Sequence, residues 1–331
     1  MKIGVVVAQD FWIHFQEIYK YLQTRHILTV FKVHKWPFQL MSSRINNALL
    51  DIELGHFMSV NDLVFFEWGE DFFVRTTHLK KSSKIMARLH LHEVWDYADR
   101  ADWSQVDRVI FVSEAMRRKF LERIPVAAGR AEMVHNGVRI DIFKPRERNF
   151  QGILGTLGRI EPHKRIYDLI LILEELRKLG FDLKLRIGGS CTESRYQRYA
   201  DEVTLLVRRT GMEDFVQFDG HVNNTSDWYK NIDIFISHSV SEGLQVALLE
   251  AMASGCYCLA HAWDGVSEVL PGENIYFNEN ELINKIKEYI TKIESEKQEE
   301  QEKLRNVAVD RFDIEKQKTR VVDIIEEVLN N

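Results

Sequence analysis

Two basic residues lie close to the predicted start of a helix in the stretch LGRIEPHKR. Arg159 follows Gly158 at the end of an apolar run, and Lys164 comes five residues later, just before a strongly amphipathic segment. Cations beside the amide groups of a helix N-terminus bind phosphate or diphosphate. An exposed basic turn would have the same sequence, so both interpretations stay open. The stretch is not a Walker loop, and GILGTLG does not match G-x-G-x-x-G.

Two glutamates lie in the apolar stretch SEGLQVALLEAMASG, which predicts a helix over 241–255. Glu242 opens it, and Glu250 follows two turns later, about 12 Å along a helix axis. A buried carboxylate without a partner is costly, so Glu250 indicates either a ligand or an exposed helix face. Two carboxylates so placed can contact the two sugars of a nucleotide sugar, while amides at Gly243 and Leu244 bind its diphosphate.

Two histidines, His90 and His92, lie in the segment IMARLHLHEVW. On a strand, residues i and i+2 share a face, so the pair could ligate a metal ion. No further His, Cys or Asp set has matching local spacing, which favours a substrate-binding or structural histidine.

These residues must be positioned by a chain in which strands alternate with helices. The predicted strands cover 2–8, 27–33, 62–68, 84–91, 108–113, 131–137, 152–158, 182–189, 215–220, 233–239, 256–261 and 274–277. The predicted helices cover 15–23, 114–124, 165–180, 199–210, 241–255, 292–305 and 313–329. This alternation predicts an α/β fold with parallel sheets covered by helices on both faces.

The pattern restarts after Pro145, which predicts two units, 1–147 and 148–310. We expect a last helix within 311–331 that crosses back to the first unit. In such folds ligands bind at the carboxyl ends of strands, where the halves face one another.

Composition narrows the class of protein. Hydrophobic residues make up 45% and charged residues 28% of the 331 residues, which is typical of globular chains. The net charge of −6 argues against a nucleic-acid binder. The three cysteines form no C-x-x-C pair, which suits free thiols in a reducing cytoplasm. The N-terminus predicts a first strand rather than a signal peptide, and no window approaches a membrane span. We therefore expect a cytoplasmic protein.

The stretch SHSVSEGLQVALLEAMASG resembles the P-S-x-x-E-G-…-L-L-E-A-M-A-x-G signature of retaining glycosyltransferases of the GT-B fold, glycosyltransferase family 4. Glu242 and Glu250, with seven residues between them, match that family's E-x7-E motif. LGTLGRIEPHKR, FDGHVNNTSDWYKNIDIFISHS and HNGVRIDIFKP are similar to three further family motifs, in the expected order. The resemblance extends through most of the second unit.

The resemblance implies two Rossmann-like domains facing an inter-domain cleft. It implies transfer of a sugar, with retention, from a nucleotide-diphosphate sugar to a hydroxyl of a glycan, lipid-linked saccharide or small molecule, as in polysaccharide biosynthesis. We expect a UDP-sugar first and a GDP-sugar next. No carboxylate is clearly placed as a nucleophile, which favours same-face displacement over a covalent intermediate.

The resemblance also implies residue roles. Arg159 and Lys164 would bind the diphosphate and stabilise the charge on the leaving group. Glu242 would contact the donor sugar, and Glu250 the ribose. His90 would reach the donor sugar, with His92 as the second choice. The remaining donor-binding residues would be Gly158, Gly188, Gly189, Gly220, Ser239, Gly243, Leu244 and Gln245. For Gly188 and Gly189, a plain tight turn is the simpler interpretation.

Neither a metal nor another cofactor is expected. The chain has no Asp-x-Asp sequence, the metal–diphosphate motif of the other large glycosyltransferase fold. Cations and helix amides would do the neutralising that a divalent ion does elsewhere.

Two features depart from or add to the family pattern. The first strand-to-helix turn reads AQDFWIHFQ without the Gly-Gly loop, so Asp10, Phe11 and Trp12 put acceptor placement in doubt. The segment EAMRRKFLERI, near HLKKSSK in sequence, is either a peripheral membrane contact or a solvated face. Its basic residues are Arg117, Arg118, Lys119 and Arg123.

Three other functions stay open. A nucleotide-sugar epimerase or hydrolase on the same fold would also bind the donor. A non-catalytic sugar-binding or scaffold member would keep the fold without turnover. A metal hydrolase built on His90 and His92 is a more distant alternative.

Overall fold

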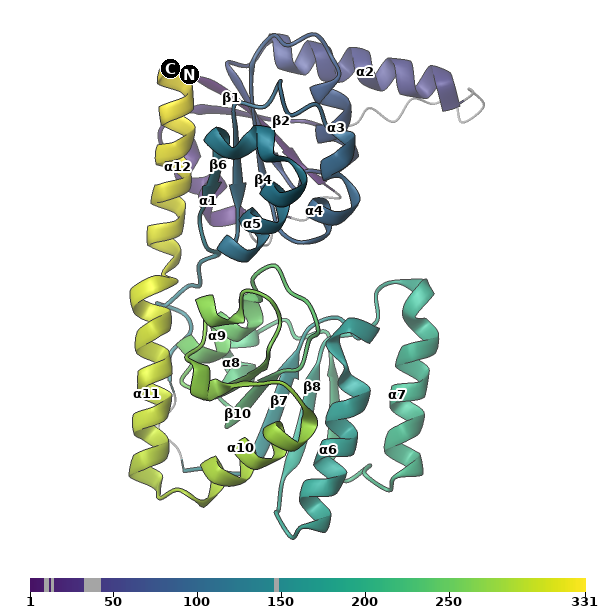
Figure 1. Ribbon diagram of the computed structural model, residues 1–331, viewed down its shortest axis with the longest axis vertical. Coiled ribbons are helices and arrows are strands. Elements are labelled where there is room, and N and C mark those ends of the chain that lie inside the picture. The colour runs from purple at the N-terminus through teal and green to yellow at the C-terminus, as the bar shows by residue number, and fades with distance from the viewer. Residues whose placement is uncertain (9–11, 13–14, 33–42, 146–148) are drawn as a thin grey trace. The chain divides into compact units, whose positions relative to one another are not determined.

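The computed structural model describes residues 1–8, 12, 15–32, 43–145 and 149–331. The chain forms two compact units: residues 1–136 with 314–331, called unit 1, and residues 137–313, called unit 2 (Figure 1). Unit 2 begins earlier than the predicted boundary at 147/148, because the connecting segment already packs against it. Val138 donates its backbone N–H to the carbonyl of Phe312 at 2.7 Å, and Phe143 is buried.

Unit 1 is built on one six-stranded parallel sheet with the strand order β2-β1-β3-β4-β5-β6. Its strands are β1 (Lys2–Val7), β2 (Ile27–Val30), β3 (Leu63–Glu67), β4 (Lys84–Leu89), β5 (Arg108–Phe111) and β6 (Ala131–Met133). Its helices are α1 (Gln16–Gln23), α2 (Ser43–Ser59), α3 (Asp71–Thr77), α4 (His92–Asp96), α5 (Glu114–Arg123) and α12 (Ile314–Asn330).

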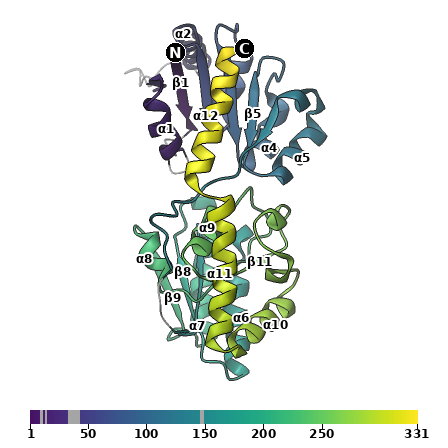
Figure 2. The same ribbon diagram turned by 90° about the vertical axis from the view of Figure 1, so that its left-hand side faces the viewer.

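The last helix of the chain belongs to unit 1. Val321, Ile324 and Ile325 are fully buried in one apolar cluster with Ile3 and Val5 of β1. Figure 2 shows α12 lying across the sheet, with α1 beside it. Apolar residues three and four positions apart give α12 the stripe that such packing requires.

Unit 2 has a second six-stranded parallel sheet, ordered β12-β11-β10-β7-β8-β9. Its strands are β7 (Ile153–Leu157), β8 (Lys184–Gly188), β9 (Val216–Gly220), β10 (Ile234–Ser237), β11 (Tyr257–His261) and β12 (Ile275–Tyr276). Its helices are α6 (Ile166–Lys178), α7 (Gln197–Arg209), α8 (Thr225–Tyr229), α9 (Val246–Ala253), α10 (Glu279–Thr291) and α11 (Glu294–Arg311). This is the Rossmann order, and it reverses between β7 and β10, where ligands of such sheets bind.

The predicted α/β class with two parallel sheets is confirmed, and each predicted strand is present. The prediction of a helix from Ser241 was wrong: α9 begins only at Val246, because Gln245 has an extended backbone with ψ 104°. His92 was wrongly placed on a strand, since β4 ends at Leu89 and His92 opens α4. No helix in the described part of the chain is long and apolar enough to cross a membrane.

Candidate active site

Glycines from three neighbouring strands meet at the carboxyl edge of the sheet in unit 2. Gly158 N–H donates to the carbonyl of Gly188 at 3.0 Å, and Gly189 N–H donates to that of Gly220 at 2.6 Å. Gly189 has φ +114°, and a Cβ at this position would overlap the carbonyl oxygen of Gly158. Only glycine fits there, because the backbone of Gly158 fills the space that a side chain would take.

Lys164 and Glu242 form an ion pair at this edge. Lys164 ends the short 3-10 turn Pro162–Lys164 after β7, and Glu242 lies in the loop after β10. A backbone hydrogen bond of 3.0 Å from Val240 to His163 ties the two loops together. Since β7 and β10 flank the reversal of strand order, the pair lies where the fold predicts a ligand.

Arg159 points to other carboxylates. Its side chain is 56% exposed and pairs with Glu161 at 3.0 Å and with Glu193 at 3.1 Å. Burial raises the pKa of Glu161, and the charge of Arg159 offsets part of that rise. The structure therefore brings Lys164 together with Glu242 but leaves Arg159 on the neighbouring acidic residues.

The loop before α9 is buried although much of it is polar. Ser239, Glu242, Gly243, Leu244 and Gln245 all have little exposed surface. Among the described residues, none bonds to the side-chain Oε1 of Gln245. A buried amide oxygen without a hydrogen bond is unfavourable, so a donor from a bound ligand would satisfy it.

Glu250 lies on α9 against Tyr229, not on an exposed face. Its Oε2 is 3.1 Å from the hydroxyl of Tyr229, which is also 2.9 Å from the carbonyl of Ala247. Burial raises the pKa of Glu250 to about 7, and the hydrogen bond with Tyr229 limits the rise. The carboxyl group therefore titrates near neutral pH, where a ligand that favours one form can shift it.

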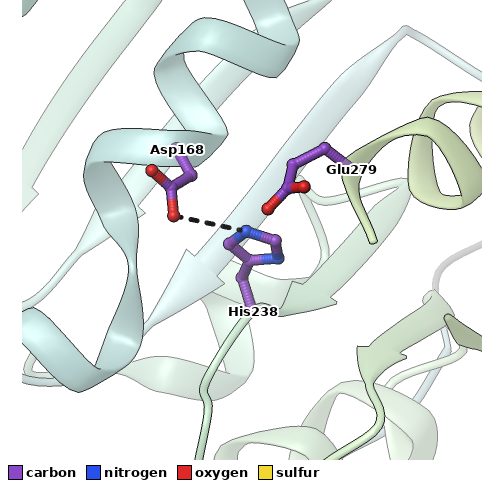
Figure 3. A group of neighbouring side chains, drawn as sticks. All are labelled: Asp168, His238 and Glu279. Atoms are coloured by element: carbon purple, nitrogen blue, oxygen red, sulfur yellow. Dashed lines mark ion pairs between the residues drawn. The ribbon is translucent and has the colours of Figure 1, made fainter. Parts of the chain in front are cut away.

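Sequence reasoning missed a further group, formed by Asp168, His238 and Glu279 (Figure 3). Their potential ligand atoms lie within 4.8 Å of one another. Nε2 of His238 is 3.9 Å from Asp168 Oδ2 and has no hydrogen bond within the described part of the chain. Burial, reinforced by the charge of Arg165, lowers the pKa of His238 to about 3. A histidine interrupting the apolar strand end IFISHS was the available signal.

This group has the residue types of a zinc site, but Arg165 already neutralises its carboxylates. Arg165 donates from Nε to Asp168 at 2.7 Å and pairs with Glu279. Its backbone is left-handed, with φ +53°. We therefore interpret the group as an ion-pair network around Arg165, which holds this strained turn next to Lys164.

In unit 1, the two histidines have separate carboxylate partners. Nε2 of His90 lies 2.9 Å from Oε1 of Glu67, and Nε2 of His92 lies 2.9 Å from Oε1 of Glu70. Each imidazole thus uses its Nε2 for a different carboxylate, and His92 lies on α4 rather than on β4. The metal interpretation of this pair therefore loses its basis in a shared strand face.

The basic residues of α5 are largely paired. Arg117 pairs with Glu114, Arg118 with Glu122 and Arg123 with Asp99. Lys119 and Arg123 also lie over the ring of Trp95, which is half exposed.

Of the turn Asp10–Trp12, Asp10 and Phe11 lie outside the described residues.

Known proteins resemble this chain in both sequence and structure. In sequence it is 26% identical, over 132 residues, to the lipopolysaccharide core biosynthesis mannosyltransferase LpcC of Rhizobium leguminosarum, covering 37% of each chain. It is 28% identical over 180 residues to the lipopolysaccharide 1,2-N-acetylglucosaminetransferase of Salmonella typhimurium, covering 50% of this chain and 47% of that one. These alignments span less than half the length of either relative.

In structure the likeness covers nearly the whole chain. The crystal structure of Anabaena HepE in complex with UDP and glucose matches with a TM-score of 0.79 over 98% of this chain and 99% of HepE, at 17% identity. The two-domain α/β fold is thus that of GT-B glycosyltransferases. The family model for glycosyl transferases group 1 matches residues 138–311. This range contains the glycines at the strand ends of unit 2 (Gly158, Gly188, Gly189 and Gly220), Lys164, Glu242 and Glu250. This chain therefore belongs to the glycosyl transferases group 1 family.

Proposed function

We propose that this protein is a retaining glycosyltransferase that moves a sugar from a nucleotide-diphosphate sugar, a UDP-sugar first, to a hydroxyl acceptor. The observation that carries the proposal is the Lys164–Glu242 pair, which lies at the reversal of strand order. Family membership supplies the reaction class. A cation and a carboxylate side by side suit a diphosphate joined to a sugar.

In this account the donor binds at the carboxyl edge of the sheet in unit 2, where the strand-end glycines lie. Lys164 exchanges its contact with Glu242 for the diphosphate, and Glu242 turns to hydroxyls of the donor sugar. Arg159, which is exposed, reaches the same diphosphate by leaving its acidic partners. Amides and side chain of the loop Gly243–Gln245 add donors, and Glu250 accepts from the ribose hydroxyls. The donor contacts the backbone of five further residues: Gly158, Gly188, Gly189, Gly220 and Ser239.

The proposed reaction needs neither a metal nor another cofactor. The negative charge that develops on the leaving diphosphate is stabilised by Lys164, Arg159 and backbone amides, which are placed before the reaction begins. We propose displacement on one face of the sugar through an oxocarbenium-like state, with the leaving phosphate oxygen taking the acceptor's proton.

The donor and acceptor classes rest on the similar proteins. HepE was crystallised with UDP and glucose, which supports a UDP-sugar, with a GDP-sugar as the second choice. Two relatives are named for lipopolysaccharide synthesis, which supports a glycan or lipid-linked acceptor bound by unit 1. Contact of α5 with an anionic membrane surface would suit such an acceptor, and Trp95 with Lys119 and Arg123 would form it.

Product analysis tests the proposal. The protein is incubated with UDP-glucose, UDP-N-acetylglucosamine or GDP-mannose, with and without lipid-linked and oligosaccharide acceptors, in the presence of chelator. We expect sugar transfer only with an acceptor, and an anomeric configuration equal to that of the donor. An epimer or free sugar without acceptor would indicate an epimerase or hydrolase. Donor binding without turnover would indicate a scaffold protein.

A further inference from the structure

Unit 1 contains a cavity of about 1140 Å³ at the carboxyl edge of its sheet. The described residues that line it include the ends of β1 and β2 and the chain directly after β3, and all of them belong to unit 1. The strand order β2-β1-β3 reverses at β1. Ligands of open parallel sheets bind where the order reverses. The cavity therefore lies where such a sheet binds a ligand.

Aromatic side chains from several segments line this cavity: Trp12, Tyr19, Phe31, Trp68 and Phe72. Each of them is half-buried. The rings of Trp12 and Tyr19 meet edge to face with centroids 5.1 Å apart, and those of Phe31 and Phe72 with centroids 5.7 Å apart. Large rings that stay half-buried around one cavity are typical of a ligand pocket rather than of a core.

Helix α1 contributes one face to the cavity. Its lining residues recur at the spacing i, i+3, i+4 and i+7: Gln16, Tyr19, Lys20 and Gln23. Ile18 and Leu22 are fully buried in the apolar cluster between α1, the sheet and α12. A helix with these two faces packs on the sheet with one and lines the cavity with the other. Polar side chains and an aromatic ring thus share the cavity.

The charges of the described lining balance, with two lysines and two acidic residues: Lys20, Lys32, Glu70 and Asp71. A nucleotide or another phosphate ligand would meet as many carboxylates as ammonium groups, so the cavity offers it no net attraction. An acyl chain would remove water from charged groups that it cannot bind, which is costly. An uncharged ligand with many hydroxyls suits both the aromatic rings and the polar groups.

We propose that this cavity recognises the acceptor of the transfer reaction by its sugar rings, as an uncharged oligosaccharide that packs against Trp12 and Tyr19. The C–H groups on one face of a pyranose pack on an aromatic ring, while its hydroxyls bind carboxylates and ammonium groups. The cavity exceeds the roughly 300–1000 Å³ of most small-molecule pockets, which leaves room for more than one ring. The inference rests on the proposed function, and a lipid-linked acceptor would be recognised by its sugar rather than by its lipid or phosphate.

Tyr21 provides a matched control on the same helix. It is half-buried like Tyr19, but it is not among the residues that line the cavity. Its ring lies near the side chains of Arg25 and Lys318. Tyr19→Ala and Tyr21→Ala therefore remove the same aromatic side chain from two faces of α1, of which only one faces the proposed ligand.

Binding is tested on the full chain without a donor, by saturation-transfer NMR from the aromatic protons of the protein. The probes are uncharged oligosaccharides of glucose, galactose, mannose and N-acetylglucosamine, with laurate and inorganic phosphate as competing classes. We expect transfer to the ring C–H protons of at least one oligosaccharide, lost in Tyr19→Ala and kept in Tyr21→Ala and Tyr19→Phe. The inference is overturned if no oligosaccharide binds, if Tyr19→Ala still binds it, or if laurate or phosphate binds in a way that Tyr19→Ala abolishes. If Tyr19→Ala does not fold, Trp12→Ala tests the same pair of rings.

Kinetics separate failure of this inference from failure of the proposed function. With an acceptor that binds, Tyr19→Ala should raise the KM for the acceptor by about 10-fold, the upper end for one aromatic contact. The kcat and the KM for the UDP-sugar should stay unchanged, because the contact is the same in the ground state and the transition state. Tyr21→Ala should change none of the three. Oligosaccharide binding without transfer would support the cavity and contradict the proposed function. Transfer with an unchanged acceptor KM in Tyr19→Ala would do the reverse.

Discussion

Lys164 and Glu242 are far apart in the sequence but form an ion pair across the reversal of strand order in the second sheet. Lys164 also runs along Gly158, with its Cε 3.5 Å from where a Cβ of that residue would lie. A cation, a carboxylate and the backbone of Gly158 thus lie together at the strand ends. In the proposed function, Lys164 binds the diphosphate of the donor and Glu242 binds its sugar.

Changing Glu242 should separate sugar transfer from nucleotide binding. In Glu242→Gln, Lys164 is released for phosphate, so UDP without its sugar should bind as well as in wild type or more tightly. Transfer should fall by about 10- to 150-fold, the equivalent of one hydrogen bond to a charged group. Calorimetry with UDP and steady-state kinetics with the UDP-sugar measure the two effects.

The matched control is Glu174→Gln, which removes a carboxylate from α6 that pairs only with Lys178 among the described residues. Glu174→Gln should change neither the affinity for UDP nor the rate of sugar transfer. Loss of UDP binding in Glu242→Gln would show that Glu242 acts on the nucleotide, contrary to its assigned role.

Glu250 should make nucleotide binding depend on pH. Its pKa of about 7 lies above the ordinary value of 4.5, so the folded protein holds this proton up to neutral pH. Ribose hydroxyls donate best to the ionised carboxylate, so affinity should rise as the pH increases from about 6 to about 8, with a proton released on binding. Calorimetry in two buffers of different ionisation enthalpy measures that release.

The same shift predicts the sign of a stability change. Because the folded state binds this proton more tightly than the unfolded state, the free energy of unfolding should fall as the pH rises from 4.5 to about 7. Glu250→Gln should remove both this slope and the proton release. Unchanged pH dependence in that variant would assign it to another group.

Gly189→Ala should be far more damaging than Gly211→Ala. Both glycines have positive φ, but nothing lies within 4 Å of a Cβ at Gly211, whereas one at Gly189 meets the backbone of Gly158. Gly211→Ala should cost about 1 kcal/mol of stability, and Gly189→Ala about 4 kcal/mol or more. Denaturant unfolding gives both values. Equal costs would mean that the chain after β7 and the chain after β8 can move apart to admit the added Cβ. The backbone at Gly158 and Gly189 would then not be rigid.

Arg165 should prevent zinc from binding to Asp168, His238 and Glu279. In wild type, micromolar Zn²⁺ should not raise the melting temperature, because Arg165 neutralises both carboxylates. In Arg165→Met, Zn²⁺ should raise it, since a neutral imidazole and two carboxylates suit this ion. Adding His238→Asn should abolish the gain. A zinc response in wild type would contradict the interpretation of this group as an ion-pair network.

The sequence predicted the sheets well because buried parallel strands leave strong apolar runs, such as those ending at Gly158 and Gly188. It failed at the start of α9, where Gly243 and the extended Gln245 override a strong helical pattern. The contact partners of the site residues could not be predicted from the sequence. Tyr229 beside Glu250, Glu67 beside His90, and Arg165 beside Glu279 are all contacts between distant segments, which neither periodicity nor local spacing encodes.

The most direct test of the central claim is thermal stabilisation by UDP, GDP and ADP with chelator present throughout. One nucleotide should stabilise the wild type, by about 2.7 kcal/mol at 100 times its dissociation constant. That shift should vanish in Lys164→Ala and persist in Lys178→Ala, which removes an exposed lysine of α6. If no nucleotide shifts the melting temperature in the presence of chelator, or if the shift survives Lys164→Ala, the metal-free diphosphate site around Lys164 is contradicted.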